Sequence, residues 1–302
     1  MLSGMRLPQF KAAFRCAAIL GCALVLGNAQ AQTGPDAVSL IPAMVEAGSP
    51  VLIHVDAPTT ARIEGDWVGH SLKFFPARGG SGWYALAGVD VEASVGRSTL
   101  QIHVTQTKGS VRDLNRMIEI HAAHYQTGSL TVEPIFVEPD PEELKRIEAE
   151  SELKAKVFAT SAGKRMWNGN FRAPVAAAPT DSFGTRRTFN GKLASIHKGM
   201  DFRARIGTPV RAGNSGVVVL AQGLYYEGNC VIIDHGLGLF TLSMHLSKIT
   251  VREGQRVMKG ALLGLSGATG RVTGPHLHWA VRWEGAYLDP AKLLQLNLNA
   301  MH

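Results

Sequence analysis

Short apolar runs separated by glycine-rich turns dominate the first half of this chain. Residues 51–55 read Val-Leu-Ile-His-Val, and residues 98–104 alternate between polar and apolar side chains. A period of two is typical of a strand that buries one face. A turn cluster at residues 78–82, Arg-Gly-Gly-Ser-Gly, separates such runs. We therefore predict a small β-sandwich of immunoglobulin-like type over residues 36–130, although the Cys…Trp…Cys signature of antibody domains is absent.

The pattern becomes helical near residue 140. Residues 141–150 are rich in charged, helix-favouring side chains, with Pro141 suited to a first helical turn and Asp140 suited to cap it. The apolar positions of this segment form only a thin stripe, at Leu144, Ile147 and Leu153. A thin stripe favours a solvated connecting helix over a partner-binding one. We predict this linker helix within residues 139–163.

The last part of the chain returns to short β-branched and aromatic runs. Four such runs, with Gly or Asn between them, lie at residues 217–221, 231–234, 239–242 and 279–283. Antiparallel strands joined by tight turns are the natural outcome of this pattern. We therefore predict a mainly β fold, in which the N-terminal sandwich and the connecting helix precede an antiparallel β domain over residues 164–302.

Length and charge place few limits on the fold and the function. The chain has 302 residues, enough for about two domains, and its 45% hydrophobic and 18% charged content is ordinary for a globular protein. Residues 1–31 carry three basic and no acidic side chains, so the remainder has 28 basic and 24 acidic residues and a net charge of +4. This mild excess suits an anionic polymer. The sequence has no RNA-binding motif or dense basic stripe, which argues against a nucleic-acid partner.

The first 31 residues predict an export signal. A basic start is followed by an apolar stretch at residues 16–27 and by an Ala-Gln-Ala cleavage site that ends at Ala31. The alternatives are an uncleaved anchor and a lipoprotein modified at Cys22. We predict export to the periplasm, with the extracellular space as the alternative, and contact with the membrane only through this signal. The mature chain keeps one cysteine, Cys230, in an apolar run typical of a buried structural thiol.

Candidate chemistry is concentrated in the last third of the chain. His197 and Asp201 form a His-x-x-x-Asp pair, His276 and His278 form a His-x-His pair, and His245 lies between the two pairs. Two imidazoles and one carboxylate are the ligand set of a catalytic zinc site that keeps one coordination position open. Two further histidines suffice to move protons. This combination indicates metal-assisted hydrolysis.

The remaining histidines match no ligand pattern. We predict a structural role for His235, because the ligand count is complete without it. We predict structural or surface roles for the histidines of the sandwich, which are His54, His70, His103, His121 and His124.

The order of these motifs resembles that of a known peptidase family. Residues 182–187 read Ser-Phe-Gly-Thr-Arg-Arg, and residues 195–202 read Ser-Ile-His-Lys-Gly-Met-Asp-Phe. Residues 245–247 read His-Leu-Ser, and residues 273–278 read Thr-Gly-Pro-His-Leu-His. Together, over roughly residues 181–290, they resemble the M23 zinc metallopeptidases, the lysostaphin- and LytM-type endopeptidases that cut peptidoglycan peptides.

The resemblance implies a site and a reaction that spacing alone does not assign. His197, Asp201 and His278 would be the Zn²⁺ ligands, and His245 and His276 the catalytic pair beside the reacting water. The implied protein is a secreted zinc metalloendopeptidase that hydrolyses peptide bonds in peptidoglycan stem peptides or cross-bridges, in cell-wall remodelling or lysis. Glycyl-glycine and D-alanyl-diaminopimelate bonds both remain open as its target, as do the oligomeric state and the role of the N-terminal domain.

Several alternatives remain open at this point. Some relatives in the family are non-catalytic activators of cell-wall amidases that have lost metal ligands, so a wall-binding protein or an amidase activator is the alternative, although this chain retains all five positions. Residues 251–264 also resemble the Gly-Val-Gly rhythm of biotinyl or lipoyl carriers, with Lys259 as the attachment residue. Arg186 and Arg187 suit either a substrate carboxylate, which a guanidinium binds through two hydrogen bonds, or a structural role.

Overall fold

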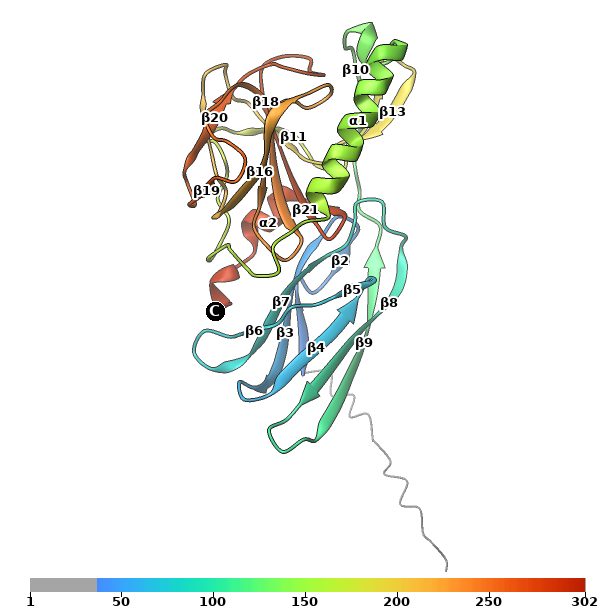
Figure 1. Cartoon of the computed structure of the whole chain (residues 1–302). Coiled ribbons are helices and arrows are strands. Elements are labelled where there is room, and N and C mark those ends of the chain that lie inside the picture. Colours follow the sequence, from blue (N-terminus) through green and yellow to red (C-terminus); the bar gives the residue numbers. More distant parts are fainter. Residues whose placement is uncertain (1–36, 302) are drawn as a thin grey trace, which may run out of the picture. The chain divides into compact units, whose positions relative to one another are not determined.

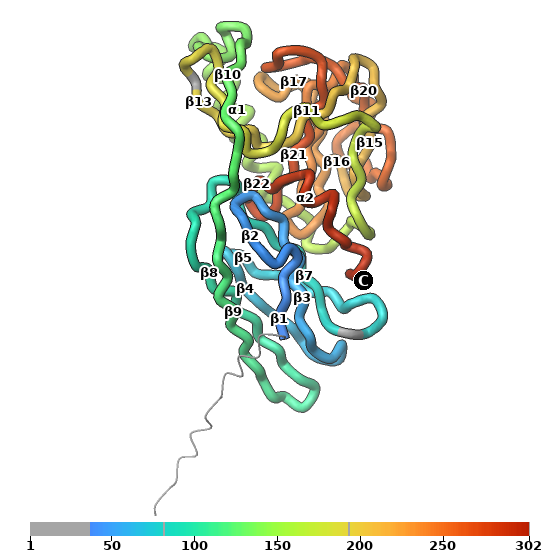
Figure 2. Tube along the Cα trace, turned by 180° about the vertical axis from the view of Figure 1, so that it is seen from behind, coloured from blue at the N-terminus to red at the C-terminus, as the bar shows by residue number. Residues whose placement is uncertain are grey.

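The computed structural model describes residues 37–301, so the predicted export signal lies outside the described residues. The described chain is mainly β, with an N-terminal sandwich and a C-terminal β domain that are joined by a linker containing one long helix (Figures 1 and 2). This architecture confirms the predicted fold class. No helix within residues 37–301 combines the length and apolar character needed to cross a membrane.

Two sheets form the N-terminal sandwich, drawn in blue to green in Figure 1. The first sheet has the strand order β1-β3-β7-β6, with β1 (Val38–Ile41), β3 (Pro50–Pro58), β7 (Ser81–Gly88) and β6 (Phe75–Pro76). The second has the order β2-β9-β8-β4-β5, with β2 (Val45–Glu46), β9 (Val111–His121), β8 (Gly96–Thr105), β4 (Arg62–Trp67) and β5 (His70–Ser71). Strands β3 and β8 contain the two runs that the sequence predicted as strands.

Apolar side chains from both sheets meet in one core. Strand β8 alternates exposed and buried positions, and it buries Leu100, Ile102 and Val104. Trp67 of β4 and Ile53 of β3 are almost inaccessible to solvent. Complete burial of one large apolar side chain contributes about 1.5–3 kcal/mol. The sandwich is therefore stabilised by the period-two pattern that predicted it.

The linker consists of a strand, a short 3-10 helix and a long helix, which are β10 (Thr127–Leu130), η1 (Pro134–Phe136) and α1 (Pro141–Phe158). Asp140 caps α1, because its carboxylate accepts hydrogen bonds from the N–H groups of Glu142 and Glu143 at 3.0 and 2.9 Å. No residue of α1 is fully buried. Its last turns still contact the C-terminal domain, since the ring of Phe158 lies 5.2 Å from that of Phe240.

One ten-stranded sheet forms most of the C-terminal domain. Its main path is β11-β14-β21-β18-β17-β16-β19, and β15, β20 and β22 pair beside this path. The strands are β11 (Pro179–Asp181), β14 (Met200–Phe202), β15 (Pro209–Arg211), β16 (Gly216–Leu224), β17 (Gly228–Asp234), β18 (Leu239–Ile249), β19 (Arg256–Val257), β20 (Leu262–Ser266), β21 (Leu277–Trp283) and β22 (Ala286–Leu288). Helices α2 (Pro290–Gln295) and η2 (Leu298–Ala300) follow the last strand.

A separate three-stranded sheet joins the linker to this domain. Strand β10 pairs in parallel with β12 (Arg186–Phe189), and β12 forms an antiparallel hairpin with β13 (Leu193–Ile196). The Asn190 side chain, in the hairpin turn, extends the contact by donating to the carbonyl of Val132 and accepting from its N–H, both at 3.0 Å. Both views of the chain show β10 and β13 together (Figures 1 and 2). Strand β10 thus lies at the end of residues 36–130, the range predicted as sandwich, but it pairs with the C-terminal domain.

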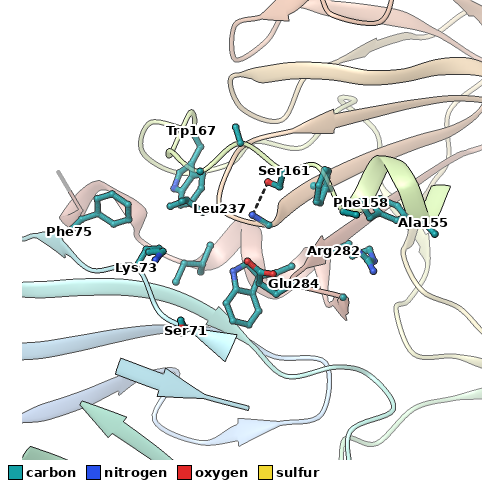
Figure 3. Close-up of a pocket in the computed structure, with 18 residues that line it drawn as sticks. Ser71, Lys73, Phe75, Ala155, Phe158, Ser161, Trp167, Leu237, Arg282 and Glu284 are labelled. Carbon is teal, nitrogen blue, oxygen red and sulfur yellow. Dashed lines mark hydrogen bonds between the residues drawn. The ribbon is translucent and has the colours of Figure 1, made fainter. Parts of the chain in front are cut away.

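Ion pairs and a cavity occur where the sandwich contacts the C-terminal domain. Lys198 pairs with Glu92, and Lys292 pairs with Glu46, each at 2.6 Å. The cavity has a volume of about 580 Å³ and is lined by residues of both regions, including Lys73, Phe75, Trp167, Arg282 and Trp283 (Figure 3). None of the five predicted site residues lines it.

Candidate active site

The sheet register brings the predicted site residues together. In the adjacent strands β14 and β21, Asp201 pairs with His278, and β18 places Met244 opposite His278 from the other side. His245 follows Met244 along β18 and therefore lies next to the same pair. His197 lies between β13 and β14, so the His-x-x-x-Asp pair spans the end of one strand and the next strand.

Three side-chain atoms converge in a tight triangle. Nε2 of His197 lies 3.0 Å from Oδ1 of Asp201 and 2.9 Å from Nδ1 of His278. The third side, from His278 Nδ1 to Asp201 Oδ1, is 2.9 Å. These three residues are the one group of possible metal ligands found within residues 37–301.

The chemistry of these atoms fits a metal ion. Nδ1–H of His197 donates to the carbonyl of Ser182 at 2.9 Å, so Nε2 of the neutral ring presents a lone pair to the triangle. Lone pairs and a carboxylate oxygen approach so closely only around a cation or a shared proton. Zinc bonds of about 2 Å would separate tetrahedral nitrogen and oxygen ligands by roughly 3.3 Å. Three such ligands leave a fourth position open, as in catalytic zinc sites.

Asp201 is kept ionised and oriented by its neighbours. Burial alone would raise the pKa of Asp201, but hydrogen bonds and charges from His197 and His278 lower that pKa well below its usual range. Its other oxygen, Oδ2, accepts a hydrogen bond from Nη2 of Arg187 at 3.0 Å, and Arg187 also pairs with Asp181. Two carboxylates of the protein therefore hold Arg187, and the geometry supports the structural alternative for this residue. Arg186, by contrast, is exposed on β12.

His245 and His276 present similar atoms to the triangle. Nδ1–H of His245 donates to the carbonyl of Thr269 at 2.9 Å, and Nδ1–H of His276 donates to the carbonyl of Gly274 at 2.8 Å. Their ring centroids lie 4.9 Å apart, and Nε2 of His276 lies 3.7 Å from Oδ1 of Asp201. Both rings line the same cleft as the triangle. Each neutral ring thus keeps Nε2 as its proton-accepting atom.

The backbone at His245 is strained. Its φ angle is +61°, in the left-handed region that residues other than glycine rarely adopt. The N–H of His245 donates to the carbonyl of Glu227 at 2.9 Å, and its ring is held by Thr269. Burial, followed by the charges of His278 and His276, lowers the pKa of His245 to about 3. Such strain is typical of functional sites, where neighbouring contacts hold a side chain in one direction.

His235 has a structural environment, in agreement with the sequence analysis. Its Nδ1–H donates to the carbonyl of Ser215, and its Nε2 accepts from the hydroxyl of Thr241, both at 2.8 Å. Burial lowers the pKa of His235 to about 4. Because both ring nitrogens have partners, His235 has no atom left for chemistry in the cleft.

The other residues that the sequence singled out lie away from the triangle. His103 of the sandwich is exposed and pairs with Asp113 at 2.7 Å. Cys230 is buried, and burial raises the pKa of its thiol, as expected for an inert structural cysteine. Lys259, in the turn between β19 and β20, donates to the backbone carbonyl of Asn170.

Gly199 and Arg271 belong to the site but were not assigned to it from the sequence. A Cβ atom on Gly199 would lie 2.3 Å from Nε2 of His278, so only glycine leaves room for this imidazole. Arg271 lines the cleft five positions before His276. The glycine between His197 and Asp201 was a visible signal, because a glycine inside a ligand motif often marks a close approach. Arg271 carries no comparable signal in the sequence.

Comparison with known proteins identifies the class of the C-terminal domain. Residues 195–290 match peptidase family M23. The chain is 48% identical over 101 residues to the peptidoglycan DD-endopeptidase ShyA of Vibrio cholerae serotype O1. These residues make up 33% of this chain and 24% of ShyA. It is 42% identical over 140 residues to the peptidoglycan DD-endopeptidase ShyB of the same organism. Those residues make up 45% of this chain and 33% of ShyB.

A solved structure extends the comparison beyond the family match. The crystal structure of a Pseudomonas aeruginosa protein assigned to the M23 peptidases matches with a TM-score of 0.62 at 28% identity, and the match covers 82% of this chain and 94% of that one. The C-terminal domain of this chain therefore resembles the peptidases of family M23 in both sequence and fold. The matched segments span only a quarter to a third of the length of ShyA and ShyB.

Proposed function

We propose that this protein is a zinc-dependent metalloendopeptidase that hydrolyses peptide bonds in peptidoglycan and so acts in cell-wall remodelling or lysis. The observation that carries the proposal is the triangle of His197, Asp201 and His278, with two further imidazoles beside it. His197, Asp201 and His278 are the proposed zinc ligands. His245 and His276 are the proposed catalytic residues.

The relatives support a particular class of bond. ShyA and ShyB are both named peptidoglycan DD-endopeptidases, and they share 48% and 42% identity with the matched parts of this chain. We therefore infer that the target is a bond between two D-centres in the cross-link between stem peptides, rather than a glycyl-glycine bridge. Because this substrate lies outside the cytoplasmic membrane, the proposal includes export, with the periplasm as the site of action.

A bound zinc ion would supply a Lewis acid and lower the pKa of a water molecule in the open position. The protein's own groups provide the proton transfers. Nε2 of His245 or of His276 accepts a proton from the attacking water, and an imidazole returns it to the leaving amine. Thr269 and Gly274 hold the opposite nitrogens as donors, which keeps both Nε2 atoms in the accepting form. Arg187 holds Asp201 in position through its second carboxylate oxygen.

The alternative is a wall-binding protein or an amidase activator without catalysis of its own. No observation favours it, because all five polar groups of the site are present and converge. A carrier function at Lys259 is disfavoured by the match of its domain to a peptidase family and by the contact of its ammonium with Asn170.

Digestion of purified cross-linked muropeptides separates these functions. The zinc-loaded protein is expected to convert dimers into monomers, as seen by mass analysis, and His278→Ala is expected to lose both the bound zinc and the cleavage. Chelation should abolish the cleavage, and added zinc should restore it. Full cleavage by a sample shown to contain no metal would overturn the proposal, and so would a zinc-loaded protein that leaves every dimer intact.

A further inference from the structure

Arg271 lies in the cleft between two aromatic rings. Its guanidinium carbon is 4.4 Å from the ring centroid of Phe189, which ends β12, and 4.4 Å from that of Tyr226, in the turn between β16 and β17. The backbone N–H of Arg271 also donates to the carbonyl of Tyr226 at 2.9 Å. The loop that carries Arg271 leads directly to His276 and His278. The cation is therefore held in place from two sides of the cleft.

Stacking leaves a particular part of this side chain available. The guanidinium carbon lies over both rings, and a guanidinium directs its five N–H groups outward in its own plane. The edge of the guanidinium plane is the part that binds a carboxylate through two parallel hydrogen bonds. An arginine stacked in this way loses little further freedom on binding, so it is already prepared for an anion.

The carboxylates that line the cleft have other partners. They are Asp181, Asp201 and Glu227. Arg187 holds Asp181 and Asp201, and Lys154 holds one oxygen of Glu227, whose other oxygen has no hydrogen-bond partner. Among the residues that the structure describes, no carboxylate oxygen lies within bonding distance of the Arg271 guanidinium.

The other lysine and arginine in the cleft wall are already neutralised. Lys198 pairs with Glu92 at 2.6 Å, and Arg187 bonds to Asp201 at 3.0 Å. Arg271 is thus the one lysine or arginine of the described cleft wall without an ion-pair partner at bonding distance, although the charge of the nearby Glu227 acts on it. Burial lowers the pKa of Arg271 because water solvates its charge incompletely. A charge of this kind favours an anionic ligand strongly.

We propose that Arg271 binds a carboxylate of the substrate, so that the cleft selects peptides with a free acid group near the scissile bond over their neutral counterparts. This inference rests on the proposed function and refines its substrate class. Stem peptides of peptidoglycan carry such groups, on D-isoglutamate and on diaminopimelate, whereas oligoglycine bridges do not. Arg271 would therefore contribute to the choice between these two kinds of cross-link.

Equilibrium binding tests this recognition without depending on cleavage. The protein used is the full zinc-loaded chain with His245→Asn, because asparagine tolerates the left-handed backbone at this position. The two probes are one synthetic cross-linked stem-peptide dimer with free carboxylates and the same dimer with those carboxylates amidated. Calorimetry is expected to show that the acid form binds at least tenfold more tightly.

Substitutions at Arg271 then test whether this residue causes the preference for the acid form. Arg271→Gln is expected to weaken binding of the acid form about tenfold to a hundredfold, the range for a hydrogen-bonded charge, and to change binding of the amidated form less than twofold. Arg271→Lys keeps the charge without the double hydrogen bond and should give an intermediate loss. The matched control is Arg252→Gln, an exposed arginine outside the cleft, which should leave both affinities unchanged.

Two results would overturn the inference. Equal binding of both dimers by the parent protein would show that no carboxylate is recognised. Equal weakening of both dimers by Arg271→Gln would show that Arg271 only holds Phe189 and Tyr226 in place. Cleavage of the same dimers by the protein with His245 intact is scored separately. Loss of cleavage with the binding preference retained would reject the peptidase activity and leave the recognition by Arg271 standing.

Discussion

The sandwich and the C-terminal domain bury different kinds of side chains. Among the described residues, Ser49 is the one polar side chain that the sandwich buries. The C-terminal domain buries a larger set, which includes Thr185, His197, Asp201, Asn214, Asp234, His235, Thr241, Ser243, His245 and Ser266. The histidines show the same contrast, because His103 of the sandwich is exposed whereas His197 is almost completely buried.

The buried side chains of the sandwich serve stability, whereas those of the C-terminal domain also form the candidate active site. Burial of a polar group is unfavourable unless it is hydrogen-bonded, so a domain that buries many of them must provide a partner for each. In the C-terminal domain those partners include backbone carbonyls, such as those of Ser182 and Thr269, which also fix which ring nitrogen faces the cleft. The sandwich needs no such arrangement, since its core is almost entirely apolar.

The largest expected effect is at His245. His245→Asn should lower kcat for muropeptide cleavage by about 10²–10⁴-fold, the usual contribution of a general acid or base, with zinc content unchanged. His103→Asn, in the sandwich, should change kcat less than twofold. Steady-state kinetics with metal analysis measures both. Comparable losses in the two variants would remove the distinction between the two regions.

A smaller effect concerns a buried histidine outside the cleft. The pKa of His235 is about 4 in the folded protein and about 6.5 in an unfolded chain. Between these values the unfolded chain binds more protons, so the stability present above pH 6.5 is lost as the pH falls to 4. This loss amounts to roughly 3 kcal/mol.

The variant His235→Gln cannot take up this proton and should lack that part of the acid sensitivity. Urea unfolding at pH 7, 5.5 and 4.5 is expected to show that the stability difference between wild type and variant shrinks by about 2.5 kcal/mol. A difference that stays constant over this range would mean that His235 is not held neutral by burial.

The smallest effect is expected at Gly199. Gly199→Ala places a methyl group against the imidazole of His278 and should weaken zinc binding about 10–100-fold, as loss of ligand orientation usually does. Gly163→Ala is the control, because a Cβ there meets nothing within 4 Å. Competition with a chromophoric chelator measures both affinities. Unchanged affinity in Gly199→Ala would show that His278 tolerates the displacement.

The parts of the fold that the sequence predicted depend on local periodicity. Strand β8 follows the predicted alternation of polar and apolar side chains, and helix α1 begins after its predicted cap, Asp140. The family resemblance rests on ordered motifs, and the structure brings His197, Asp201 and His278 together. The catalytic and ligand roles of these residues stay a prediction until metal binding is measured.

The parts that could not be predicted depend on contacts between distant segments. Nothing near Arg187 indicates that its partners are Asp181 and Asp201, and the sequence left open whether it binds substrate. The space beside Gly199 is limited by His278, which belongs to another strand. The stacking of Arg271 likewise requires Phe189 from the β12 hairpin. Local patterns hold no information about such pairs, because the fold alone brings them close.

The pairing of β10 with β12 has a consequence for how such proteins are shortened or recombined. A fragment that starts at residue 164 would remove β10, so β12 would become an edge strand paired only with β13, and Asn190 would lose the backbone of Val132. That edge carries Phe189, one of the two rings that hold Arg271. A transferable unit that keeps this pairing therefore begins before Thr127, upstream of the family match, and a chimaera joined downstream of this point would lose the contacts that support this part of the cleft wall.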